Sequence, residues 1–100
     1  MGTRCTIEVE GISFAKVYKH WDGYPEATLK WLEVFNKRFN ENRGDDPEYK
    51  FAQLLRSSKE FEEEFNLDDN LYTGWGVVPF DHPHEDYHYI LHSDGTVSFT

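Results

Sequence analysis

The chain has 100 residues, 17% of them aromatic, and a formal net charge of −9; this composition supports one domain with one core and disfavours contact with a nucleic-acid backbone. A lone cysteine, Cys5, excludes an internal disulfide and a zinc site built on several cysteines, and it fits a reducing compartment. Because no apolar stretch is long enough to span a membrane and the N-terminus lacks a signal peptide's apolar region, we expect a cytoplasmic protein with a single domain over residues 1–100.

The N-terminal residues predict a β-hairpin. Apolar and polar residues alternate over residues 3–10, as in a strand that is buried on one side. A second strand is expected over residues 14–21, after a turn. A three-residue loop sets Ile7 opposite Val17 and keeps the apolar faces of the two strands together.

Two helices are predicted after the hairpin. Pro25 suits the first position of a helix that runs to about Asn40, and Pro47 suits the start of a second helix. Each helix has an apolar stripe that should face the core, made of Leu29, Trp31, Leu32, Val34, Phe35 and Phe39 in the first and Phe51, Ala52, Leu54 and Leu55 in the second. Ser57 or Ser58 either caps a short third helix or lies within a longer second helix.

Three further strands are predicted near the C-terminus, over residues 71–80, residues 87–92 and the last residues of the chain. Residues 92–95 fit a type I turn with a glycine bulge, a register that pairs Leu91 with Val97 and Tyr89 with Phe99. A two-residue turn would pair His92 with Val97 instead. The first register is favoured because it separates apolar from polar side chains.

These elements predict an α+β fold in the order ββααβββ, an antiparallel sheet of about five strands with the helices packed on one face. No segment then remains to cover the other face of the sheet. The side chains expected on that open face are Arg4, Thr6, Glu8, Lys16, Tyr18, His20, His88, Ile90, His92, Thr96 and Ser98, together with Trp75 and Val77. Such a face is typical of a partner-binding surface, although single exposed apolar residues are also ordinary on a solvated face.

Charge is divided unevenly along the chain. No lysine or arginine follows Lys59, whereas residues 60–100 hold ten carboxylates and four of the five histidines. The acidic run at residues 60–69 is typical of a solvated helix face, and the alternative is a mimic of a phosphate backbone. An acidic field attracts a basic protein surface and weakens with salt. Because carboxylates raise the pKa of nearby histidines, we also expect association to strengthen between about pH 7 and about pH 5.5.

Histidines and carboxylates gather in residues 82–88. If these residues lead into a strand, their two-residue periodicity puts His84, Asp86 and His88 on one side, a donor set that suits a divalent transition metal. The spacing matches no established zinc motif, so we expect no cofactor and keep this metal site as the alternative. Cys5 is expected in the core, since its position in the strand points inward.

Residues 18–26 read Tyr-Lys-His-Trp-Asp-Gly-Tyr-Pro-Glu. This segment resembles the (Arg/Lys)-His-Trp-Asp-Gly-Tyr-Pro segment of an uncharacterised family of small proteins from phages, bacteria and archaea, which suggests an origin in a phage or another mobile element. The resemblance implies no activity. It implies that residues 20–25 form a shared corner, structural or functional. Gly23 and Pro25 have backbone roles, so His20, Trp21 and Tyr24 are the positions expected to serve function.

We therefore expect a small acidic binding or regulatory module, not an enzyme, that contacts a basic protein or a second copy of itself. Direct contact with nucleic acid or with a membrane is not expected. The residues predicted for the contact surface are Tyr18, His20, Trp21, Asp22, Tyr24, Trp75, His88 and His92. The alternative is a histidine and carboxylate enzyme, such as a metal-dependent hydrolase, that works around His20, His84 and His88.

Overall fold

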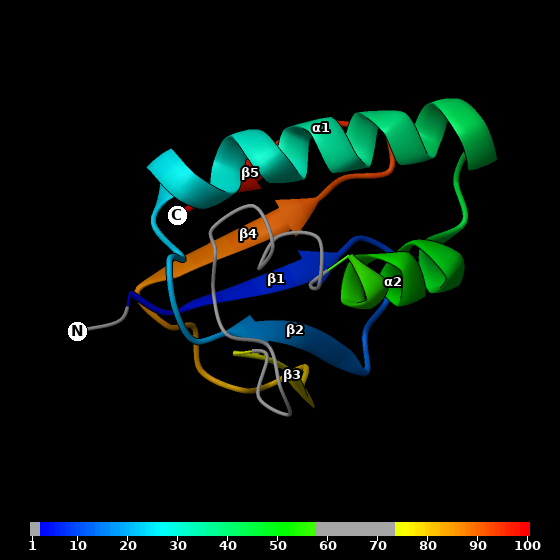
Figure 1. Ribbon diagram of the computed structural model, residues 1–100. Helices are drawn as coiled ribbons and strands as arrows, with labels where there is room; N and C mark the ends of the chain where they lie inside the picture. The colour runs from blue at the N-terminus through cyan, green and yellow to red at the C-terminus, as the bar shows by residue number, and fades with distance from the viewer. Residues whose placement is uncertain (1–2, 58–73) are drawn as a thin grey trace.

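The computed structural model describes residues 3–57 and 74–100 of an α+β protein with a five-stranded sheet (Figure 1). Its described elements, in chain order, are β1 (Cys5–Val9), β2 (Ala15–Lys19), α1 (Pro25–Arg43), α2 (Pro47–Arg56), β3 (Trp75–Pro79), β4 (Tyr87–Leu91) and β5 (Val97–Phe99). The short third helix predicted after Ser57 and the predicted start of the third strand lie outside the described residues.

Both hairpins have the predicted registers. Ile7 lies opposite Val17 in the first hairpin, and Leu91 lies opposite Val97 in the second. In the second turn, the amide of Gly95 donates to the carbonyl oxygen of His92 at 3.1 Å. Gly95 has a φ of 96°, which a glycine bulge requires and which a side chain would oppose.

The sheet is mixed, which corrects the prediction of an antiparallel sheet. Its strand order is β3-β2-β1-β4-β5, and β1 and β4 pair in parallel, from Cys5 opposite Tyr87 to Val9 opposite Leu91. Figure 1 shows β4 starting at the end of the sheet where β1 also starts. Because β4 pairs with β1 and not with β3, residues 80–86 must pass across β2 and β1. We call residues 80–86 the crossover.

Both helices pack on the same face of the sheet. Leu32 of α1 and Leu54 of α2 are fully buried in one cluster with strand residues such as Ile7 and Tyr89. Two predicted core positions are wrong, since Val34 is 45% exposed and Ala52 is also exposed. The apolar stripe of each helix that reaches the sheet is therefore narrower than the sequence pattern indicates. Within residues 3–57 and 74–100, no helix has the length and apolar character needed to cross a bilayer.

The crossover covers the centre of the face that the helices leave free, which we call the outer face. Thr6, Lys16 and His88 of the outer face are only 0%, 2% and 4% exposed. The ring of His84 stacks on that of His88, with centroids 3.7 Å apart, and the ring of Phe80 lies 6.0 Å from Nζ of Lys16. The expectation of an open outer face is wrong at its centre, because the parallel pairing of β4 sends the connecting segment over it.

Candidate functional site

Residues 20–25 form a fixed corner between β2 and α1. Three buried side chains donate hydrogen bonds to consecutive backbone carbonyls of the corner: Lys19 Nζ to Trp21, Thr28 Oγ1 to Asp22 at 2.5 Å, and Tyr89 Oη to Gly23 at 2.6 Å. Buried carbonyl groups need such partners, so these bonds set the path of the chain. The corner is therefore rigid at the point where its side chains reach the surface.

The backbone of the corner accounts for Asp22 and Gly23. The amide of Gly23 donates to the carbonyl oxygen of Thr3 at 2.8 Å, and a Cβ added to Gly23 would lie 2.8 Å from Cβ of Cys5. Asp22 has a φ of 57°, in the left-handed region that aspartate enters more readily than most residues. The geometry of the turn thus accounts for the presence of Asp22 and Gly23 in the shared segment.

Tyr18, His20 and Trp21 form an aromatic row that leads from β2 into the corner. Oη of Tyr18 and Nδ1 of His20 are hydrogen-bonded at 2.7 Å, and the rings of His20 and Trp21 meet edge to face at 5.0 Å. Trp21 is 37% exposed. Among the described residues, no hydrogen bond joins His20 to Asp22, so the structure pairs this histidine with a phenol and not with the neighbouring carboxylate.

The crossover extends this row with His82 and Glu85, which belong to the run at residues 82–88 but were not among the residues predicted for the site. The ring of His82 lies edge-on to Tyr18, with centroids 6.1 Å apart, and Nε2 of His82 is 2.8 Å from Oε2 of Glu85. The three-residue spacing of His82 and Glu85 was the one local signal for their pairing. The contact with Tyr18 has no local signal, because it depends on where the crossover lies. We call Tyr18, His20, Trp21, His82 and Glu85 the crossover site.

Tyr24 and Trp75 lie apart from the crossover site. Tyr24 precedes the first residue of α1 and is 36% exposed at the same corner. Trp75 lies opposite Lys19 in the sheet, on the side of the helices, where its ring meets that of Trp31 at 6.2 Å. The prediction that Trp75 belongs to the outer face is therefore wrong, because the register of β3 turns it toward α1.

His88 is buried at the centre of the outer face and is fully engaged. Its Nδ1 lies 2.7 Å from Oγ1 of Thr6, and its Nε2 lies 3.1 Å from Oε1 of Glu8. Burial lowers the pKa of His88, and the adjacent His84 lowers it further, while Glu8 opposes both effects. The predicted rise in pKa is wrong for His88, because the loss of hydration outweighs the attraction of the carboxylate.

His84, Asp86 and His88 do not converge on a metal position. His84 stacks on His88, and Oδ2 of Asp86 accepts a hydrogen bond from the amide of Arg4 at 3.0 Å. Across the two described parts of the chain, no three His, Cys, Asp or Glu residues are grouped to hold a metal ion. The two-residue periodicity used for the prediction holds only within a strand, and β4 begins at Tyr87.

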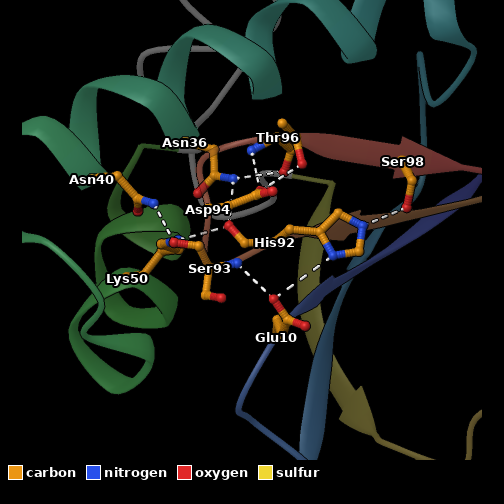
Figure 2. Close-up of polar contacts among 9 residues, drawn as sticks. All are labelled: Glu10, Asn36, Asn40, Lys50, His92, Ser93, Asp94, Thr96 and Ser98. Carbon is orange, nitrogen blue, oxygen red and sulfur yellow. Dashed lines mark hydrogen bonds and ion pairs between the residues drawn. The ribbon is translucent and has the colours of Figure 1, made fainter.

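The turn between β4 and β5 is tied to the helices by a polar cluster (Figure 2). The bonds that attach it to α1 are Asn36 Nδ2 to the carbonyl oxygens of His92 at 3.0 Å and Thr96 at 2.9 Å, and Asn40 Nδ2 to that of Ser93 at 2.6 Å. Asn36 is fully buried. These asparagines act as anchors for the turn. The sequence did not indicate this role, although both residues are polar and lie on the buried side of α1.

The ring of His92 lies at the edge of this cluster and away from the crossover site. Its Nε2 is 2.8 Å from Oγ of Ser98, and its Nδ1 is 3.7 Å from Oε1 of Glu10 (Figure 2). The backbone and side-chain hydrogen bonds from Ser93 lower the pKa of Glu10. His92 thus belongs to the turn structure, and the structure does not bring it together with His20 or His88.

Cys5 is a core residue, as predicted, and should be inert toward thiol reagents. It is fully buried, and burial raises the pKa of its thiol to about 12, although the charge of Lys19 acts in the opposite direction. We expect labelling by Ellman's reagent in the native state to be slower by at least about 100-fold than in denaturant, at a rate limited by opening of the fold. Rapid labelling of the native protein would show that Cys5 is accessible.

The crossover site combines a carboxylate–imidazole pair with a phenol–imidazole pair, groups that can exchange protons and donate hydrogen bonds. These side chains lie over the outer face, whereas a hollow of about 410 Å³ lies on the other layer, between α1 and α2. No family model matches the sequence, and no curated protein or solved structure shows significant similarity to it.

Proposed function

We propose that the chain is a binding module whose crossover site takes up a basic segment of a partner protein. The observation that carries this proposal is the contact between the crossover and the aromatic row. The ring of His82, which is paired with the carboxylate of Glu85, lies against Tyr18, and the same row continues through His20 to the partly exposed indole of Trp21. Tryptophan and tyrosine are among the residues that contribute most to protein–protein affinity.

The electrostatic field supports a basic partner on this side of the molecule. Residues 74–100 contain no lysine or arginine, and Lys16, the outer-face lysine of β2, is 2% exposed. The exposed cations of the helices, such as Lys37 and Arg38, lie on the other layer. A basic partner would therefore be steered toward the crossover. A second copy of the chain is the weaker alternative, since each copy carries a net charge of −9.

The rigidity of the corner supports binding over catalysis. The carbonyl groups of residues 21–23 are held by buried donors, so Trp21 needs little ordering when a partner arrives. The hollow of about 410 Å³ lies between the helices and is not lined by His82 or Glu85. A rigid and open site fits recognition of an extended segment.

The proposal is tested by titrating the ¹⁵N-labelled protein with a Lys/Arg-rich peptide and with the same peptide carrying glutamine at each basic position. We expect amide shifts in residues 18–22 and 80–86 with the basic peptide only, and weaker binding at high salt. The Asp81→Asn, Glu85→Gln double variant should lose roughly fivefold in affinity, since each exposed ion pair contributes up to about 1 kcal/mol.

The matched control is the Glu33→Gln, Glu41→Gln double variant, which removes the same charge from the exposed side of α1. It should bind the basic peptide as the unmodified protein does. Equal losses in the two double variants would mean that net charge alone attracts the peptide. Shifts confined to the acidic run at residues 60–69 would place binding outside the crossover site. Either result would overturn the proposal.

A further inference from the structure

A second surface lies between the two helices, and its charged residues are arginines, whereas those of the crossover are carboxylates. A hollow of about 410 Å³ lies between α1 and α2, on the layer away from the crossover site. Its lining includes the aromatic residues Trp31, Phe35 and Tyr49 and the arginines Arg38 and Arg43. A volume of this size is in the range of small-molecule sites in proteins.

Aromatic rings form a continuous floor along this hollow. Trp31, Phe35 and Phe39 follow one another at four-residue intervals on α1, so their rings share one side of the helix. The rings of Trp31 and Phe35 are 6.0 Å apart and nearly parallel, and those of Phe35 and Phe39 are 6.3 Å apart. Tyr49 of α2 continues the row at 6.4 Å from Phe39. A flat apolar body can stack on such a floor.

The cations at the hollow differ in what they already contact. Arg43 lies 3.9 Å above the ring of Tyr49, and its Nη2 is 3.3 Å from Oδ2 of Asp46. Arg38 is exposed and makes no ion pair with any residue in the described parts of the chain. Its planar guanidinium is therefore available to bind a carboxylate with two parallel hydrogen bonds.

We infer that the hollow between α1 and α2 binds a small molecule that joins a planar aromatic body to a carboxylate. The aromatic floor takes the ring system, and Arg38 takes the carboxylate at the rim. Charge complementarity selects this ligand class, because the arginines of the lining attract an anionic aromatic compound more strongly than a neutral one. This site is independent of the binding surface proposed above, and it lies on the other layer of the fold.

The experiment titrates the full-length ¹⁵N-labelled protein with 2-naphthoate and with the neutral 2-naphthamide, following backbone amides and tryptophan indoles. We expect naphthoate to shift the resonances of Phe35, Arg38 and Tyr49 and to bind about tenfold more tightly than naphthamide. Arg38→Gln should remove this preference by weakening naphthoate alone by about tenfold. Lys37→Gln, which removes the same charge from the adjacent exposed position, should leave both affinities unchanged.

Three results would overturn the inference. Equal affinities for naphthoate and naphthamide would show that no charge is recognised. Equal effects of the Arg38 and Lys37 substitutions would show that general attraction accounts for binding. Absence of naphthoate binding by the unmodified protein would show that the hollow does not take this class of ligand.

Discussion

Replacing Gly23 by alanine should lower the free energy of unfolding by about 3 kcal/mol, at the upper end of the cost of overpacking. The added Cβ would lie 2.8 Å from Cβ of Cys5 and 2.9 Å from the backbone of Arg4 and Cys5. Backbone atoms of β1 cannot move aside as the end of a flexible side chain can. The corner would have to shift and would weaken the hydrogen bond from Tyr89 to the carbonyl of Gly23. Urea denaturation of both proteins measures the difference.

Gly76→Ala is the matched control for this substitution. A Cβ at Gly76 meets no atom within 4 Å, and the residue lies inside β3. Because alanine loses less conformational entropy than glycine in a strand, this variant should be as stable as the unmodified protein or more stable by up to about 1 kcal/mol. A Gly23 variant as stable as the Gly76 variant would show that the corner has room for a side chain. Loss of basic-peptide binding by the Gly23 variant alone would further connect the corner to the proposed function.

The stability of the protein should fall as pH decreases below about 6.5, because the folded state resists protonation of His88. Its pKa in the folded state is lowered by burial and by His84. The unfolded chain therefore takes up the proton first, and the free energy of unfolding decreases until the folded-state pKa is reached. For one proton the slope cannot exceed about 1.4 kcal/mol per pH unit. The groups that face His88 are Thr6 and Glu8 of β1, Lys16 of β2 and His84 of the crossover.

Two glutamine variants distinguish the contribution of His88 to the pH dependence of stability from that of another histidine. His88→Gln keeps a side chain that can hydrogen-bond to Thr6 and Glu8 and removes the titrating ring, so its stability should depend less steeply on pH between about 7 and about 5.5. His92→Gln leaves His88 in place and should keep the slope. Urea denaturation at several pH values measures both. An unchanged slope in the His88 variant would mean that another group governs the acid sensitivity.

The pKa of His88 is shifted in the direction opposite to the one that the sequence predicts. The acidic surroundings of the C-terminal histidines favour their charged form and predict association that strengthens in acid. For His88, the crossover removes water from the ring and stacks a second imidazole on it, and both effects favour the neutral form. Charge counts along the chain could not include this desolvation, because it comes from residues 80–86 passing over the sheet.

Local patterns were sufficient for much of the fold. Proline at positions 25 and 47 predicted where each helix starts, since its ring suits the first helical turn. Alternation of apolar side chains predicted the pairing of Ile7 with Val17 and of Leu91 with Val97, because a shift by one residue would expose every apolar side chain. The inward position of Cys5 followed from the same alternation.

The sequence by itself thus determined the helix starts, the two hairpins and the acidic character of the C-terminal part. Only the tertiary structure decided that β4 pairs in parallel with β1, that His88 is buried and that His82 meets Tyr18. The physical reason is the range of the interactions. Turns and periodic side chains act between residues close in the chain, whereas the place of β4 depends on the pairing and burial that the whole sheet gains when the crossover closes over it.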